Sequence, residues 1–115
     1  KQKAGAAMQF YKNIWISENA AGKKFQIMWK LKHFRPQADV YVLVLANNSH
    51  DLIHMYPAKE LLKPYYKKIQ REMFVIGIAR TRPAALELIR QIVQEVYEKT
   101  GGCDIRAYVG NPAGT

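Results

Sequence analysis

The chain has 115 residues, of which 49% are hydrophobic and 23% charged. This length suits one domain with one core, and the composition is not that of a disordered, collagen-like or solenoid protein. The longest apolar run, at residues 40–46, is far shorter than the roughly 20 residues of a membrane-spanning helix, so we expect no membrane partner. Cys103 is the only cysteine, which excludes a disulfide within the chain and favours a reducing cytoplasm.

Among the overall properties of the sequence, the net charge differs most from the value typical of an enzyme. Lysine and arginine number 18 against 9 acidic residues, which gives a formal net charge of +9 and a pI near 9.8. A positive field attracts polyanions, and neutralising their phosphates releases counterions. The charge therefore favours a nucleic acid or another polyanion as a partner, but it does not locate a site.

The first part of the chain is predicted to form a strand and a helix. Residues 1–8 have a basic start with no apolar stretch behind it, and we expect a disordered leader rather than a signal peptide. Residues 9–17 alternate apolar and polar side chains at their centre, which predicts a strand. Ser17 or Asn19 can cap the helix that follows, and Pro36 ends it. The apolar face of this helix comprises Ile27, Met28, Leu31 and Phe34.

A β-hairpin is predicted next. Residues 39–46 form a continuous β-branched and aliphatic run, which is typical of a central strand covered on both faces. Turn-forming residues at 47–50 lead to a second arm at 52–56, which Pro57 ends. Pro64 interrupts any helix between residues 58 and 70, so we expect one short helical turn followed by an exposed basic loop.

The last part of the chain is predicted to form a strand, a long helix and a final strand. Residues 73–79 have the pattern of a buried strand, and Gly77 within it implies that another backbone or a helix approaches closely, in a gap that a ligand could also use. The helix after Pro83 ends at Gly101. Its apolar stripe comprises Ala85, Leu88, Ile89, Ile92, Val93 and Val96. Its solvated face comprises Glu87, Arg90, Gln94, Glu95 and Glu98. We expect residues 105–109 to form the last strand and residues 110–115 a disordered tail.

The predicted element order is β-α-β-β-β-α-β, in one α/β (α+β) domain over residues 9–109. Two right-handed β-α-β crossovers would place the two main helices on the same face or on opposite faces of one mixed sheet. We favour a ferredoxin-like arrangement, in which a mixed sheet of about five strands and two helices form two layers.

A first basic segment covers residues 19–38, which include no acidic residue. Lys23, Lys30 and His33 share the helix face opposite the apolar stripe, with Phe25 and Trp29 along its border. Basic groups with flanking aromatic rings can bind phosphates and stack on bases. We favour the structural interpretation, a solvated face with packed aromatic rings, because no known nucleic-acid-binding signature accompanies the segment.

A second basic segment lies on the predicted loop at residues 59–71, and Tyr65 and Tyr66 lie among its cations. Lys63, Lys67 and Arg71 are its candidate contacts to a single-stranded nucleic acid. A surface loop fixed by two tyrosines is the interpretation we prefer, since binding loops and ordinary loops share this composition.

The turn at residues 80–83 is a third candidate. A strand-to-helix turn presents free backbone N–H groups, and Arg80 and Arg82 beside it could bind a phosphate or carboxylate. The turn lacks the glycines of a Walker loop or a dinucleotide-binding fingerprint. We therefore prefer Thr81 as an ordinary N-cap of the long helix.

The residues needed for catalysis are few. His50 and His54 have a metal-ligand spacing for a helix but fall across a turn and a strand, so we predict no metal site. Cys103 has no predicted partner and is expected to be a small buried thiol. Glu95 and Glu98 lie on the solvated helix face. We therefore expect neither an enzyme nor a cofactor.

The strand pattern at residues 74–79 is followed by helix segments at 85–89 and 92–97 and by a helix end at 100–102. With this pattern, the chain resembles a family of small uncharacterised bacterial proteins. The strand at 11–17, the strand at 52–56 and residues 64–66 also fit that pattern. This resemblance implies a cytoplasmic protein of unknown activity, with no catalytic residues to carry over.

Three functions are consistent with the sequence. The first is a non-enzymatic regulatory or interaction domain that forms a homodimer by pairing an edge strand, such as the first or the last. The second is a nucleic-acid-binding module that uses the helix at 23–35 and the loop at 59–71. The third is a site for a small anion at the turn 80–83.

Overall fold

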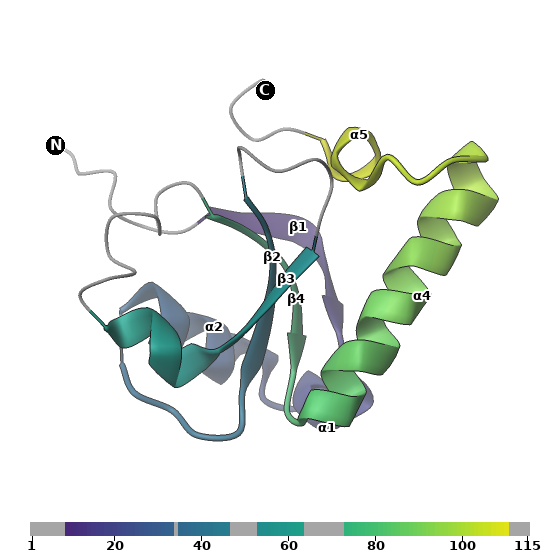
Figure 1. Ribbon diagram of the computed structural model, residues 1–115. Helices are drawn as coiled ribbons and strands as arrows, with labels where there is room; N and C mark the ends of the chain where they lie inside the picture. The colour runs from purple at the N-terminus through teal and green to yellow at the C-terminus, as the bar shows by residue number, and fades with distance from the viewer. Residues whose placement is uncertain (1–8, 34, 47–52, 64–72, 111–115) are drawn as a thin grey trace, which may run out of the picture.

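The computed structural model describes residues 9–33, 35–46, 53–63 and 73–110. Its elements follow along the chain as β1 (Gln9–Ile16), α1 (Glu18–Ala21), α2 (Lys24–Lys32), β2 (Tyr41–Ala46), β3 (Ile53–Pro57), the 3-10 helix η1 (Ala58–Leu62), β4 (Met73–Ala79), α4 (Arg82–Thr100) and α5 (Ile105–Val109) (Figure 1). The predicted first helix is therefore two helices, separated at Gly22 and Lys23.

The four strands form one mixed sheet in the order β1-β4-β2-β3. β1 pairs with β4 in parallel, while β2 pairs antiparallel with both β4 and β3. The β2–β3 pairing confirms the predicted hairpin. β2 and β4 are the inner strands, which agrees with their continuous apolar sequences because both faces of an inner strand are covered.

One face of the sheet packs against α2 and η1. Val42 and Val44 of β2 belong to the same buried cluster as Ile27 and Leu31 of α2 and Leu61 of η1. Ile27 and Leu31 follow the predicted apolar stripe of this helix at i, i+4 spacing. The first basic segment is thereby fixed to this face of the sheet.

The opposite face packs against α4 and α5. Leu43 and Leu45, which alternate with the residues of the first cluster along β2, are buried with Leu88 and Ile92 of α4 and Ile105 of α5. The described residues thus form three layers, with helices on both faces of the sheet (Figure 1), instead of the predicted two. Neither a sheet of five strands nor a ferredoxin-like order is confirmed.

The predicted last strand is wrong, because residues 105–109 form the helix α5. The Asp104 side chain accepts a hydrogen bond from the backbone N–H of Ala107 at 3.0 Å and caps this helix. Ile105, Tyr108 and Val109, at helical spacing, pack against the α4 side of the sheet. Edge-strand pairing through this segment is therefore not available to a homodimer, and dimerisation through β1 stays a prediction.

A carboxylate of α4 joins three elements on that side of the sheet. Glu95 accepts a hydrogen bond from Trp15 Nε1 of β1 at 3.2 Å and another from the Tyr108 hydroxyl of α5 at 2.7 Å. The prediction that Glu95 faces water is therefore wrong. Val93, predicted to belong to the apolar stripe, is instead exposed.

Gly77 leaves room for a close approach, as predicted. A Cβ atom at this position would lie 2.9 Å from Leu43 Cδ1 and 3.3 Å from Leu88 Cδ2. The β2–β4 register also shifts between Leu43 and Val44, so that Ile76 has no partner on β2. This bulge directs both Ile76 and Gly77 toward α4, and the absence of a side chain at Gly77 lets the helix pack there.

Several predictions fall outside the described residues. They concern the leader at 1–8, Phe34, the turn at 47–50, most of the basic loop and the end of the tail. Gly110, predicted to begin the tail, forms the C-cap of α5. Among the helices of the described ranges, none combines the length and the apolar character that crossing a bilayer requires.

We predict that Gly77→Ala destabilises the fold, because the new methyl group overlaps two buried leucines. The expected loss is about 1–3 kcal/mol in the free energy of unfolding, measured by urea denaturation. Gly22→Ala is the matched control, since nothing lies within 4 Å of a Cβ atom there. Equal stability of the two variants would contradict the packing that we describe.

The Tyr108–Glu95 hydrogen bond predicts a loss of stability at alkaline pH. This bond, together with desolvation and the charge of Glu95, raises the pKa of Tyr108 to about 12. An unfolded tyrosine has a pKa of about 10, so the contribution of Tyr108 is complete below that pH and is lost as the pH rises toward the folded value. The difference in unfolding free energy between the wild type and Tyr108→Phe should shrink across this window. Tyr97→Phe, which removes an exposed hydroxyl on α4, is the control variant.

Candidate functional site

The candidate site lies at the carboxyl ends of the parallel strands β1 and β4. The chain leaves β1 toward the face that α2 covers and leaves β4 toward the face that α4 covers. In open α/β sheets, adjacent parallel strands whose connections diverge in this way leave a crevice at their carboxyl ends, and ligands bind there. Two hollows flank this edge in the described structure, one basic and one acidic.

The basic hollow is a small depression between α2, residues 37–40 and the end of β4. Its volume is about 110 Å³. Lys23, Lys30 and Arg80 supply its positive charges, and Gln26 and Gln37 supply amide groups. Within the described residues none of the three cations forms an ion pair. The hollow therefore has an uncompensated positive charge that suits an anion.

The backbone of residue 39 fixes the position of Arg80. Asp39 adopts a left-handed conformation with φ of 57°, which aspartate tolerates better than most residues. Its carbonyl oxygen accepts a hydrogen bond from Arg80 Nε at 2.9 Å. The backbone N–H of Arg80 donates to Asn19 Oδ1 at 3.3 Å. The guanidinium is thus anchored at one nitrogen, and Arg80 is one of the residues that line the hollow.

An aromatic ridge, formed by Phe25, Trp29 and His33, follows the outer side of α2. Phe25 is 82% exposed and Trp29 is 50% exposed, so the prediction that these rings pack into the core is wrong. The His33 ring stacks on Trp29 with centroids 4.4 Å apart. The Arg35 guanidinium lies 5.9 Å from the Trp29 ring centroid and the Lys24 ammonium 5.6 Å from that of Phe25. Exposed rings beside cations form a surface on which planar groups can stack.

The orientation of His33 is fixed by the helix itself. Its Nδ1 lies 2.9 Å from the Trp29 carbonyl oxygen, and because a carbonyl only accepts, Nδ1 carries the hydrogen. Nε2 then points away from this bond and can contact a ligand.

The structure brings together some of the predicted site residues and separates others. Lys23 and Lys30, predicted for nucleic acid, and Arg80, predicted for a small anion, line the same hollow. Thr81 is the N-cap that we preferred, because its Oγ1 accepts from the Ala84 N–H at 3.1 Å. Arg82 begins α4 and is not among the residues that line the hollow.

The second basic segment is only partly described. Lys63 forms an ion pair with Glu60 at 2.7 Å at the end of η1 and does not line the basic hollow. Lys67 and Arg71 lie outside the described residues. Lys59 lines a second small hollow that shares Gln37 with the first, and Asp39 lines that second hollow as well.

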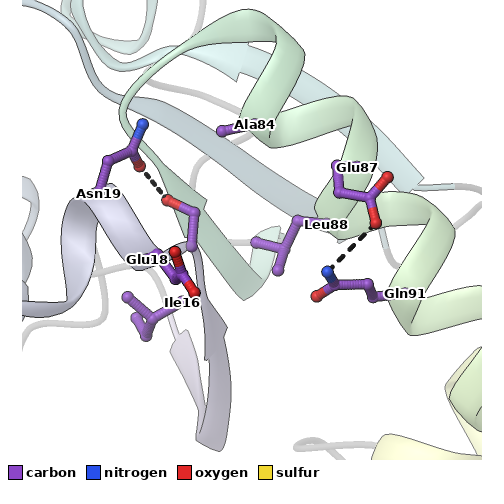
Figure 2. A pocket seen from close by; sticks show the side chains of 8 residues that line it. Ile16, Glu18, Asn19, Ala84, Glu87, Leu88 and Gln91 are labelled. Atoms are coloured by element: carbon purple, nitrogen blue, oxygen red, sulfur yellow. Dashed lines mark hydrogen bonds between the residues drawn. The ribbon is translucent and has the colours of Figure 1, made fainter.

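The acidic hollow, which we name the carboxyl-edge crevice, lies on the α4 side of the same edge. Its volume is about 600 Å³, and α1 and the first three turns of α4 form its walls (Figure 2). Glu18 and Asn19 come from α1, and Glu87 and Gln91 come from α4. Sequence reasoning missed this crevice because its two carboxylates are far apart in the chain and belong to ordinary helix surfaces.

Other candidate groups do not assemble into a catalytic site in the described residues. Cys103, expected to be buried, is exposed. In the parts of the chain that the structure describes, no group of three His, Cys, Asp or Glu side chains could bind a metal ion, and His50 lies outside them. We assign no nucleophile, base or cofactor.

Comparisons with known proteins provide no identification beyond this geometry. The resemblance to a family of small bacterial proteins therefore stays a prediction, and so does a cytoplasmic location. No family model, curated protein or solved structure matches this chain.

Proposed function

We propose that the basic hollow and the aromatic ridge bind a single-stranded nucleic acid. The observation that carries this proposal is the convergence of Lys23, Lys30 and Arg80 from two distant segments, next to exposed aromatic rings on the same helix. Single-strand-binding proteins combine a positive groove for the backbone with rings on which bases stack. Both parts are present here.

The hollow suits one phosphate group. Its volume of about 110 Å³ corresponds to roughly four water molecules at ~30 Å³ each, which is too little for a whole nucleotide. Lys23 and Lys30 approach from one helix, and Arg80 approaches from the end of β4. Because Arg80 is already anchored on the Asp39 carbonyl, it loses less freedom when it binds an anion.

The aromatic ridge suits unstacked bases. Trp29 directly precedes Lys30 in α2, about 100° away around the helix, so a strand whose phosphate occupies the hollow can place a base on this ring. Stacking on an aromatic side chain contributes about 1–3 kcal/mol per base and tolerates any base. Bases of a duplex are already stacked on one another, so we infer a preference for single strands.

The proposal combines two of the three functions that the sequence suggested. Arg80 from the turn at 80–83 supplements the basic helix rather than forming a separate site with Arg82. The alternative, an interaction domain that dimerises through the edge strand β1, is checked by light scattering of the free protein.

We predict salt-dependent binding to single strands. Fluorescence anisotropy with a labelled oligothymidine should show affinity falling linearly with salt on a logarithmic scale, with a slope of about −0.7 per neutralised phosphate. Lys30→Gln should weaken binding about tenfold and make this slope shallower. Lys99→Gln removes the same charge at the far end of α4 and should change neither quantity. Absence of binding at low salt, or equal loss in both variants, would rule the site out.

The stacking part of the proposal has its own test. Trp29→Ala should weaken binding by the equivalent of about 1–3 kcal/mol while leaving the salt slope unchanged, because no charge is removed. Tyr97→Ala removes another exposed aromatic ring, on α4, and serves as the control. If the two variants bind equally well, the ridge does not contact the bases.

A further inference from the structure

The carboxyl-edge crevice is a second hollow whose chemistry is opposite to that of the basic hollow. Glu18 and Glu87 lie on its two walls, and its described lining residues include no lysine, arginine or histidine. Leu88 lies between Glu18 and the hydrogen-bonded pair of Glu87 and Gln91 in Figure 2, and Ile16 and Ala84 add further apolar surface. The crevice therefore has an apolar floor between two carboxylates.

The hydrogen-bonding groups of the crevice are mainly acceptors. The buried Ser17 donates its hydroxyl hydrogen to Asn19 Oδ1, which leaves the lone pairs of the Ser17 oxygen available. The Ala84 N–H, at the start of α4, is used by the Thr81 side chain, and the Gln91 amide donates to Glu87 at 3.3 Å. Among the described lining residues, the side-chain donors that remain are the Asn19 amide nitrogen and the second hydrogen of Gln91 Nε2. A ligand that donates hydrogen bonds is therefore favoured.

The two carboxylates differ in how they are compensated. Glu87 is bound from outside by Arg90, whose hydrogen bonds hold its pKa below the ordinary value, so it stays ionised. Glu18 forms no ion pair with any other described residue. The uncompensated charge lies on the α1 wall, next to Ser17.

We propose that the carboxyl-edge crevice binds an organic cation, namely a primary amine or guanidinium on a short aliphatic chain. The charged group lies between Glu18 and the Ser17 oxygen, and the chain lies along Leu88 and Ile16. A volume of about 600 Å³ is within the range of small-molecule sites, which is roughly 300–1,000 Å³. This site is distinct from the proposed nucleic-acid site, because the two hollows share no lining residue in the described part of the chain.

The positive net charge of the protein helps to distinguish specific binding of a cation from non-specific attraction. A chain of formal charge +9 repels cations over most of its surface. Saturable binding of an amine therefore requires a local negative site, and non-specific attraction works against it.

The test is isothermal titration calorimetry with agmatine, which has both a guanidinium and an amine, and with glutarate as an anionic probe of similar length. We expect saturable binding of agmatine and none of glutarate. Glu18→Gln should weaken agmatine binding about tenfold or more, because it removes a charge-assisted hydrogen bond. Glu98→Gln, on the outer face of α4, is the matched control and should bind as the wild type does.

A second variant separates loss of the site from loss of folding. Ser17→Ala removes the neutral acceptor and should weaken agmatine binding less than Glu18→Gln does, while circular dichroism confirms that both variants are folded. No saturable binding at millimolar agmatine, unchanged affinity in folded Glu18→Gln, or preferential binding of glutarate would each overturn the proposal.

Discussion

The parallel pairing of β1 with β4 is the constraint on which both candidate sites depend. Residues 9–16 and 73–79 are far apart in the sequence, yet their strands end at the same edge of the sheet. Because one chain connection then passes to the α2 face and the other to the α4 face, the edge is open between them. A β1 strand paired elsewhere would separate α1 from the start of α4 and would remove the crevice.

Arg80 and Asn19 are the residues at which the two hollows meet. The Arg80 backbone is bonded to Asn19, which lines the acidic crevice, while the Arg80 side chain borders the basic hollow. The left-handed backbone at Asp39 directs the carbonyl that anchors this side chain. Opposite charges therefore lie on the two sides of a single strand end, and the +9 charge of the chain is unevenly distributed at this edge.

The sequence predicted the inner strands and the long helix well, because continuous apolar runs and a regular stripe at helical spacing are strong signals. It failed at residues 105–109, where five residues are too few to distinguish a strand from a helix and Asp104 as a cap was overlooked. It also failed at Gly22, which divides the first helix.

The candidate site was only partly predictable. Lys23, Lys30 and Arg80 were each identified, but their convergence depends on strand pairing that no local pattern encodes. Gln37 and Asp39 were missed because their roles come from backbone geometry. Phe25 and Trp29 were expected to be packed, since aromatic side chains usually are, and only the position of α2 on the sheet shows them to be exposed.

The two tryptophans give the protein two optical reporters on opposite faces of its sheet. Trp15 is partly buried and hydrogen-bonded to Glu95 where β1, α4 and α5 meet, whereas Trp29 is half exposed on α2. Replacing either one with phenylalanine leaves a single emitter whose environment is known. Solvent quenchers should then reach the Trp29 indole much more readily than the Trp15 indole. The fluorescence of each single-tryptophan variant therefore reports on one helical layer of the protein.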